Sequence, residues 1–255
     1  MGRDGRDTNA DEERRAPGSS SARKVLQLLF AFDENRTSAT VAELAALGEI
    51  PLPTAYRHVA LLKDLGLLEE GRGGQYRPTM KVLPLAQAAR LSNSLADLAR
   101  PLIAEASAAF DETVMLKRYT GDGVICVEVK ETDQAMRFTF QRGRVTPLGR
   151  GGSGKMALAM LPAETRRLWL RSHGDAALEA ECALIAERGY AISESEIDRG
   201  VWACSVPATT DSTRPIVLTV AGPDVRFDEA TRAAAPQLLK RYADRIAALV
   251  AAYDI

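Results

Sequence analysis

Three helical patterns followed by a short hairpin, and beyond them strands on both sides of a helical middle, predict an α+β chain. The first part, residues 21–78, has the order of a winged helix-turn-helix. A linker and dimerisation segment over 79–100, mostly a helix over 79–98, then joins it to an α/β domain over 101–255. A chain of 255 residues is long enough to form two compact domains.

The first 20 residues mix charge, Gly and Ser without periodicity, which predicts a disordered tail. Its four arginines are candidates for contacts with a DNA backbone. Five acidic residues of the same segment oppose them, so a solvated tail is the preferred interpretation.

Helix signals mark the start of each element in the first domain. Ser21 is a candidate N-cap for a helix over 22–32, and Thr40 with Glu43 forms a capping-box pattern for a second helix. Pro53 suits the first turn of a third helix, which Gly66 ends. The sequence LLEEGRGGQYRP that follows predicts the hairpin, or wing. The residues expected to face inward from the second and third helices are Leu44, Leu47, Ala55, Val59, Leu62 and Leu65.

The outer face of the third helix carries Thr54, Tyr56 and Arg57 near its N-terminus, where a major-groove helix needs short polar or bidentate side chains. Arg57 is the strongest candidate, because a guanidinium can hold guanine O6 and N7 or bridge phosphates. The alternative is an ordinary surface arginine, and Tyr56 can equally cover the helix edge. We interpret His58 as a satisfied, partly buried side chain.

Further basic residues are candidates for contacts to DNA phosphates, which carry no sequence information. They are Lys24 at the start of the first helix, and Arg72 and Arg77 on the wing.

The second domain should begin with a helix near 101–111, after a 79–98 helix in which Pro84 predicts a kink or a late start. Strands are expected at TVMLKRY, GVICVEVK, MRFTFQRG, WACSVPAT and PIVLTVAG. Helices are expected at 154–161, 163–171, 176–188 and 228–252, so that helices cover one face of a sheet.

Composition limits the classes of function. Between residues 21 and 80 there are seven basic and seven acidic residues, so any DNA affinity must come from where the charges lie and from dimerisation. Three cysteines without a CxxC pair predict reduced thiols in a cytoplasm and no metal site. The sequence contains neither a signal-peptide pattern nor an apolar run that would span a membrane.

The order of parts and several strings resemble the IclR family of bacterial transcriptional regulators. The strings are VAELA, IPLPTAYRHVALLKDLGLLE, GQYRP, ARPLIAEAS, GSGKMALA, ERGYAISESEIDRGV and LTVAGP, and the match covers about 21–252. The resemblance implies a winged helix-turn-helix, a GAF-like effector-binding domain, and dimers or tetramers on palindromic operators.

The chain departs from the family pattern at several positions. Glu49 stands where the helix-turn-helix turn usually has Gly, and Pro53 stands in place of a usual Ser. Ala203 and Ser193 replace a frequent Cys and a common acidic residue of the expected effector pocket.

The Gly-rich stretch GRGGSGKM, residues 149–156, formally matches the first part of a phosphate loop, but Met156 stands where Ser or Thr must bind Mg²⁺. We therefore expect Gly151, Gly152, Ser153 and Gly154 to place free N–H groups at a helix N-terminus, which attract a carboxylate. The resemblance points the same way, to a pocket for small organic acids. Lys155 either assists or only solvates the helix start.

Other effector-pocket candidates come from the sheet and a closing loop: Met115, Met136, Phe138, Ser193, Glu194, Cys204 and Thr219. A Met or Phe in a strand is more often a core residue. Cys204 has no nearby histidine in sequence, and GxSxG does not occur, so neither a cysteine nor a serine hydrolase is supported.

The sequence thus predicts a cytoplasmic, nucleoid-associated regulator that binds double-stranded operator DNA and a small effector. It should act as a homodimer or a dimer of dimers, with no cofactor and no catalytic residues. The alternatives are a small-molecule enzyme and a winged-helix module that binds proteins.

Overall fold

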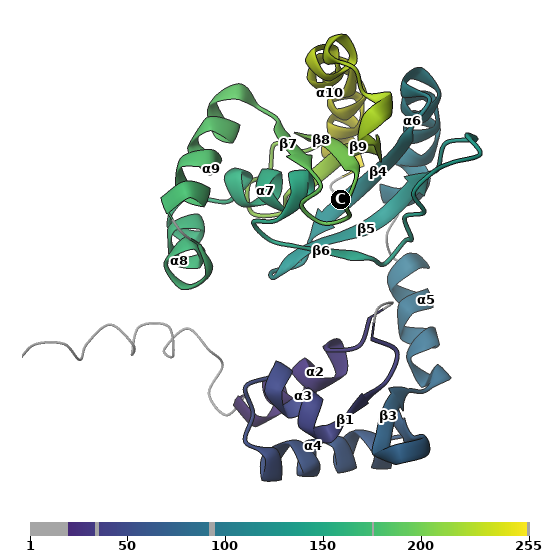
Figure 1. Cartoon of the computed structure of the whole chain (residues 1–255), viewed down its shortest axis with the longest axis vertical. Coiled ribbons are helices and arrows are strands. Elements are labelled where there is room, and N and C mark those ends of the chain that lie inside the picture. Colours follow the sequence, from purple (N-terminus) through teal and green to yellow (C-terminus); the bar gives the residue numbers. More distant parts are fainter. Residues whose placement is uncertain (1–19, 34–35, 92–94, 175, 254–255) are drawn as a thin grey trace, which may run out of the picture. The chain divides into compact units, whose positions relative to one another are not determined.

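The computed structural model describes residues 20–33, 36–91, 95–174 and 176–253. The predicted tail over 1–20 lies outside them except for Ser20. The chain divides into two compact units between Leu91 and Ser92 (Figure 1).

The N-terminal unit begins with helices α2 (Ser20–Phe30), α3 (Val41–Leu47) and α4 (Leu52–Asp64). The wing is β2 (Leu68–Glu70) and β3 (Gln75–Pro78), joined through η1 (Arg72–Gly74). A two-residue strand, β1 (Ala39–Thr40), was not predicted; it pairs with β3, which gives the sheet order β1-β3-β2. The unit closes on η2 (Met80–Val82) and α5 (Leu83–Leu91).

The expected capping box starts α3. The Thr40 hydroxyl accepts a hydrogen bond from the Glu43 amide at 3.2 Å, and the Glu43 carboxylate accepts one from the Thr40 amide at 2.7 Å. In the following turn Glu49 adopts a φ of 50°, while Gly48 has a φ of −88°. Glu49 thus takes the left-handed conformation that glycine adopts most easily.

The apolar core of this unit is built from α2, α3, α4 and β2, through Leu28, Leu44, Val59, Leu62 and Leu68 among others. The expectation that Leu47 and Leu65 face inward was wrong, since their exposed fractions are 49% and 48%. Leu47 is the last residue of α3, and Leu65 is the C-cap that follows α4.

The predicted helix over 79–98 was also wrong in its extent. Helix α5 starts late, at Leu83, with Pro84 in its first turn, and is described as far as Leu91, since residues 92–94 lie outside the described residues. Helix α6 (Leu95–Phe110) then opens the second unit, and Pro101 lies inside it.

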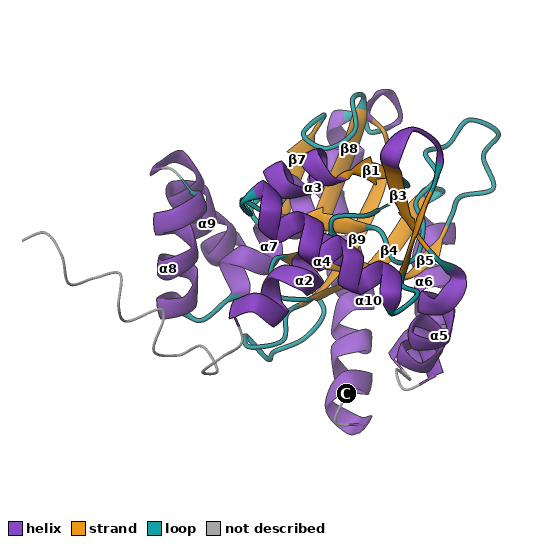
Figure 2. Ribbon diagram, turned by 90° about the horizontal axis from the view of Figure 1, so that it is seen from below, coloured by secondary structure: helices purple, strands orange, loops and turns teal. Residues whose placement is uncertain are grey.

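The C-terminal unit is a six-stranded antiparallel sheet of order β6-β5-β4-β9-β8-β7 (Figures 1 and 2). Its strands are β4 (Thr113–Tyr119), β5 (Gly123–Lys130), β6 (Val145–Pro147), β7 (Ala191–Glu194), β8 (Val201–Pro207) and β9 (Ile216–Pro223). Its other helices are α7 (Gly151–Met160), α8 (Ala163–His173), α9 (Ala176–Arg188), η3 (Asp224–Arg226) and α10 (Glu229–Tyr253).

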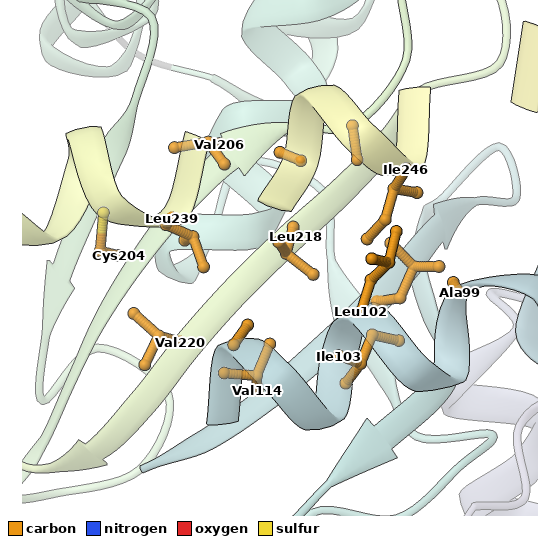
Figure 3. Close-up of a cluster of buried hydrophobic side chains, with 14 of the residues drawn as sticks. Ala99, Leu102, Ile103, Val114, Cys204, Val206, Leu218, Val220, Leu239 and Ile246 are labelled. Atoms are coloured by element: carbon orange, nitrogen blue, oxygen red, sulfur yellow. The ribbon is translucent and has the colours of Figure 1, made fainter. Parts of the chain in front are cut away.

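Helices cover both faces of this sheet, where the sequence predicted one covered face. Helices α6 and α10 pack on one face around Val114, Leu218 and Val220 (Figure 3). Helix α7 packs on the other face, with α9 against it. In β4, β8 and β9 the even-numbered residues point to α6 and α10, so the odd-numbered ones point to the α7 face.

The predicted strand MRFTFQRG was wrong: residues 136–143 form an irregular segment. Residues 123–125 of β5 pair with β6, with Val124 opposite Thr146, and residues 136–143 pair with no strand in the described part of the chain. The alternation in the sequence arises because Phe138 and Phe140 pack on a small apolar cluster while their neighbours stay exposed. Strand β7 was not predicted.

Candidate functional site

The start of α4 is an exposed polar surface in the N-terminal unit. Tyr56 and Arg57 are exposed and Thr54 is half-buried, while Ala55 beneath them is fully buried. Arg57 Nη2 donates to Thr54 Oγ1 at 3.2 Å. Within the described residues no carboxylate pairs with Arg57, so its guanidinium keeps donors for an outside acceptor.

The wing and α2 place the other three basic candidates. Arg72 is exposed at the wing tip, and Lys24 is half-buried on α2. Arg77 is exposed but forms an ion pair with Glu69 across the hairpin, at 2.6 Å. Within the described chain the wing therefore presents one arginine without an ion pair, Arg72, and one that is paired, Arg77.

His58 differs from its sequence interpretation, which was a satisfied side chain. It is buried with 7% of its surface exposed, and its Nε2 has no hydrogen-bond partner in the described part of the chain. Burial lowers the pKa of His58, and the charges of Arg57 and Lys24 lower it further. The ring is therefore held neutral on the inner side of α4.

A small cavity of about 50 Å³ lies in the C-terminal unit, between the sheet and the start of α7. Odd-numbered strand residues form its floor, the 141–146 segment one side, and residues 196–198 another. The residues on its wall are Met115, Lys117, Cys126, Phe140, Gln141, Arg144, Thr146, Gly151, Gly152, Ser153, Ser193, Glu196, Ile197, Asp198, Val201, Ala203, Thr219 and Ala221.

Lys117 is the most unusual member of the wall. Its side chain is buried, and its Nζ donates to Thr146 Oγ1 at 2.9 Å and to Ser153 Oγ at 3.1 Å. No carboxylate of the described residues lies within ion-pair distance of it. Burial lowers the pKa of Lys117 to about 8, and the charge of Arg144 acts in the same direction.

The second basic residue of the wall, Arg144, has a carboxylate partner. Its Nη2 lies 3.0 Å from Asp198 Oδ1, and its guanidinium lies over the ring of Phe140, 5.8 Å from the centroid. This contact ties the 196–198 segment to the side of the cavity.

The N-terminus of α7, where the sequence predicted free N–H groups, already has an anion from the chain itself. Glu196 Oε2 accepts from the Gly151 amide at 3.1 Å. The other oxygen of that carboxylate accepts from Lys155 at 2.6 Å, and Lys155 also pairs with Glu181 on α9 at 2.7 Å. Lys155 is buried, so it does not solvate the helix start, as the sequence had allowed.

Half of the predicted pocket residues meet at this cavity: Met115, Gly152, Ser153, Ser193 and Thr219. The structure places the other five elsewhere: Met136, Phe138, Gly154, Glu194 and Cys204.

The reasons differ. Cys204 has even parity on β8 and lies in the cluster under α10 (Figure 3). Met136 is exposed because its segment is not a strand, and Phe138 packs at the edge of the apolar cluster beside the cavity. Glu194 is exposed and pairs with Arg232. Gly154 does not line the cavity, and a Cβ added to it would lie 2.1 Å from the Pro147 carbonyl oxygen.

Sequence reasoning missed Lys117, Arg144 and Glu196. One signal was available for Lys117: it stands two residues after Met115 in a strand of apolar residues, so both share a face. Glu196 and Arg144 come from irregular segments, whose path no periodicity predicts.

The structure gives the rival chemistries no support. Burial raises the pKa of Cys204 to about 12 and that of Cys126 to about 11, which disfavours the thiolate that a nucleophile needs. The lysine of the phosphate-loop-like stretch is engaged by two carboxylates. Among the described residues, no cluster of three metal-ligating side chains occurs. None of the helices described is long and apolar enough to cross a membrane.

Comparison with known proteins gives the same division. The model of the IclR helix-turn-helix domain matches residues 21–72, and that of the bacterial transcriptional regulator IclR C-terminal domain matches residues 87–248. The regulator KipR of Bacillus subtilis is 27% identical over 218 residues, which cover 81% of this chain and 87% of KipR.

Two solved structures have the same fold. An IclR family regulator from Brucella abortus superposes with a TM-score of 0.79 at 18% identity, and 95% of each chain is covered. An IclR homologue from Microbacterium hydrocarbonoxydans, solved in complex with 4-hydroxybenzoate, has a TM-score of 0.64 at 23% identity, over 91% of this chain and all of the other.

Both halves of the sequence therefore match one family, in order, and the structure has the two domains of that family. The chain belongs to the IclR family of bacterial transcriptional regulators, with a helix-turn-helix DNA-binding domain and a C-terminal effector domain.

Proposed function

We propose that this regulator binds a palindromic operator as a homodimer or a dimer of dimers, and that a small organic acid in the C-terminal cavity controls the binding. It works in the cytoplasm, on nucleoid DNA, and catalyses no reaction. The observation that carries the proposal is the exposed polar start of α4, with an arginine that no carboxylate of the described chain neutralises.

In this proposal the N-terminal unit reads bases with α4 and holds phosphates elsewhere. Arg57 contacts a base edge, Thr54 orients it through their mutual hydrogen bond, and Tyr56 packs against the sugar-phosphate backbone. Arg72 and Lys24 contact phosphates. Arg77 does so by exchanging Glu69 for a phosphate oxygen.

The effector proposal is supported by the cavity and by one relative. Lys117 and Arg144 place two cations on a wall that also carries hydroxyl groups and the apolar Met115. The Microbacterium homologue was solved with an aromatic acid, 4-hydroxybenzoate. The segment over 79–100, between the two units, is the route by which the effector changes operator affinity.

The first test of this function is to identify the operator. Sequencing the DNA that the protein binds in its own cell should recover sites with an inverted repeat, whose halves lie about one helical turn or a multiple of it apart. Light scattering of the complex should then give an even number of chains per site. Recovery of random DNA, or of a single chain on each site, would contradict the proposal.

We expect Arg57→Ala to lower affinity for the recovered operator about 10- to 100-fold, because a bidentate base contact contributes about 1–3 kcal/mol of discrimination. Fluorescence anisotropy with labelled operator measures this change. Arg241→Ala, which removes one exposed arginine of α10, is the matched control and should leave the affinity unchanged. An operator affinity that Arg57→Ala does not alter removes Arg57 from the DNA-reading surface.

A further inference from the structure

We infer that Lys117 anchors the carboxylate of the effector, and that the effector is a small monocarboxylate. This inference rests on the proposed function for the role of the ligand, and on the cavity for its chemistry.

The cavity wall carries a buried positive charge, the ammonium of Lys117. Lys117 is buried among hydroxyl groups, and its two hydrogen-bond partners, Thr146 and Ser153, are neutral. A buried ammonium without a counter-ion is costly, and a carboxylate placed beside it removes most of that cost. The site therefore favours an anion over a neutral molecule of the same shape.

Three other groups around the cavity that could bind an anion already have carboxylate partners in the chain. Arg144 has Asp198 at 3.0 Å, and the amide of Gly151 has Glu196 at 3.1 Å. Lys155, behind that amide, holds Glu196 and Glu181. Each of these groups already has a carboxylate of the chain, which leaves Lys117 as the cation on the described wall without one. Lys117 thus presents one ammonium that a single carboxylate can contact.

The cavity is small, with a volume of about 50 Å³. Met115, Val201 and Ala221 give it an apolar floor, and Ser193 and Thr219 add hydroxyl groups. A short acid with a small apolar or hydroxylated body fits this space.

Binding of a carboxylate at Lys117 should be coupled to uptake of a proton. The titratable groups that face Lys117 from the neighbouring elements are Cys126, Arg144, Glu196 and Asp198. Guanidinium and carboxylate groups ordinarily stay charged between pH 7 and 9.5, and burial raises the pKa of Cys126 to about 11. Lys117, with a pKa of about 8, is the wall group that titrates in this range. A carboxylate bound to the ammonium raises that pKa, so binding takes up protons near pH 8.

The experiment is calorimetric titration of the full chain with propionate at pH 8, in Tris and in triethanolamine, whose ionisation enthalpies differ. The expected result is uptake of about half a proton per propionate, since a group with a pKa of about 8 is half protonated at that pH. Affinity should fall as the pH rises from 7 to 9.5. Propionamide, which is neutral with a similar shape, and malonate, which carries a second charge, should each bind at least tenfold more weakly.

Three variants locate the effect. Lys117→Met should bind propionate at least about tenfold more weakly, because a hydrogen bond to a charged group is lost, and should take up no proton. Lys117→Arg keeps the charge and should bind without proton uptake. Lys240→Met removes an exposed lysine of α10 and should match the wild type.

Four results would overturn the assignment: no propionate binding, equal binding of propionamide, tighter binding of malonate, or proton uptake that survives in Lys117→Met. The first three and the uptake measurement on the wild type need no variant, so a misfolded variant does not decide the outcome. Operator affinity measured on the same preparation separates the two proposals. Proton-linked propionate binding that leaves operator affinity unchanged supports the anchor and contradicts the effector role.

Discussion

The imidazole of His58 is buried in the N-terminal unit with an Nε2 that lacks a hydrogen-bond partner among the described residues. A buried polar atom without a partner costs about 1–3 kcal/mol. An apolar residue at this position would avoid that cost. The position therefore lowers the stability of the domain that carries α4.

A pH dependence follows from the lowered pKa of His58. In the unfolded chain the ring takes up a proton near pH 6.5, whereas the folded state resists that proton. Stability is therefore complete above about pH 6.5 and decreases as the pH falls below it. Hydrogen exchange of the α4 amides in the full chain, compared at pH 7.5 and 5.5, measures this loss.

His58→Leu is the matched variant. It should slow exchange at pH 7.5, corresponding to a gain of about 1 kcal/mol, and should abolish the part of the pH dependence that His58 contributes. Exchange in α4 that depends on pH to the same extent in the variant would show that another group is responsible.

At the scale of single elements, the capping box of α3 is a local device that the sequence alone identifies. Its two reciprocal hydrogen bonds satisfy amides at the start of a helix of seven residues. We expect Thr40→Ala to lower the free energy of unfolding by about 1 kcal/mol, as is typical for loss of an N-cap. Thr40→Ser keeps the hydroxyl and should retain most of the stability in urea unfolding. A loss equal to that of Thr40→Ala would show that the methyl group, and not the cap, matters.

Elements with local signals were predictable, and elements set by distant neighbours were not. The capping box, Pro53 and Gly66 placed α3, α4 and the wing because each signal acts within its own few residues. Residues 136–143 alternate like a strand, but a strand also needs a partner, and no strand of the described chain pairs with them. The short strands β1 and β7 likewise depend on partners far along the chain.

The cavity shows the same limit at the level of the site. Successive side chains of a strand point to opposite faces of the sheet. This alternation could have placed Lys117 on the same face as Met115, and Cys204 on the face opposite to Thr219. In the register Ser205 lies opposite Thr219, and Cys204 lies opposite Val220. Once the even positions are seen to pack under α10, Cys204 cannot stand in for the cysteine that the family often has at Ala203. The roles of Glu196 and Arg144 depend on loop paths that need the whole fold.

At the scale of the whole molecule, the charge balance makes the salt dependence informative. Residues 21–80 carry equal numbers of basic and acidic side chains, so few phosphate contacts are expected and each should be countable. Operator affinity should weaken as salt rises, with a linear plot of log affinity against log salt. Arg72→Ala should reduce the slope by about one and weaken binding to all sequences alike. An unchanged slope would show that the wing tip does not contact phosphate.

Glu196 makes two contacts that hold its segment to α7. Its carboxylate accepts a hydrogen bond from the Gly151 amide and pairs with the buried Lys155, whose other partner is Glu181. A bound molecule that displaced the 196–198 segment would break both contacts of Glu196, whereas a molecule that fits beneath the segment would leave them intact. We therefore expect these two contacts to favour small molecules over large ones, whatever functional groups the molecules carry.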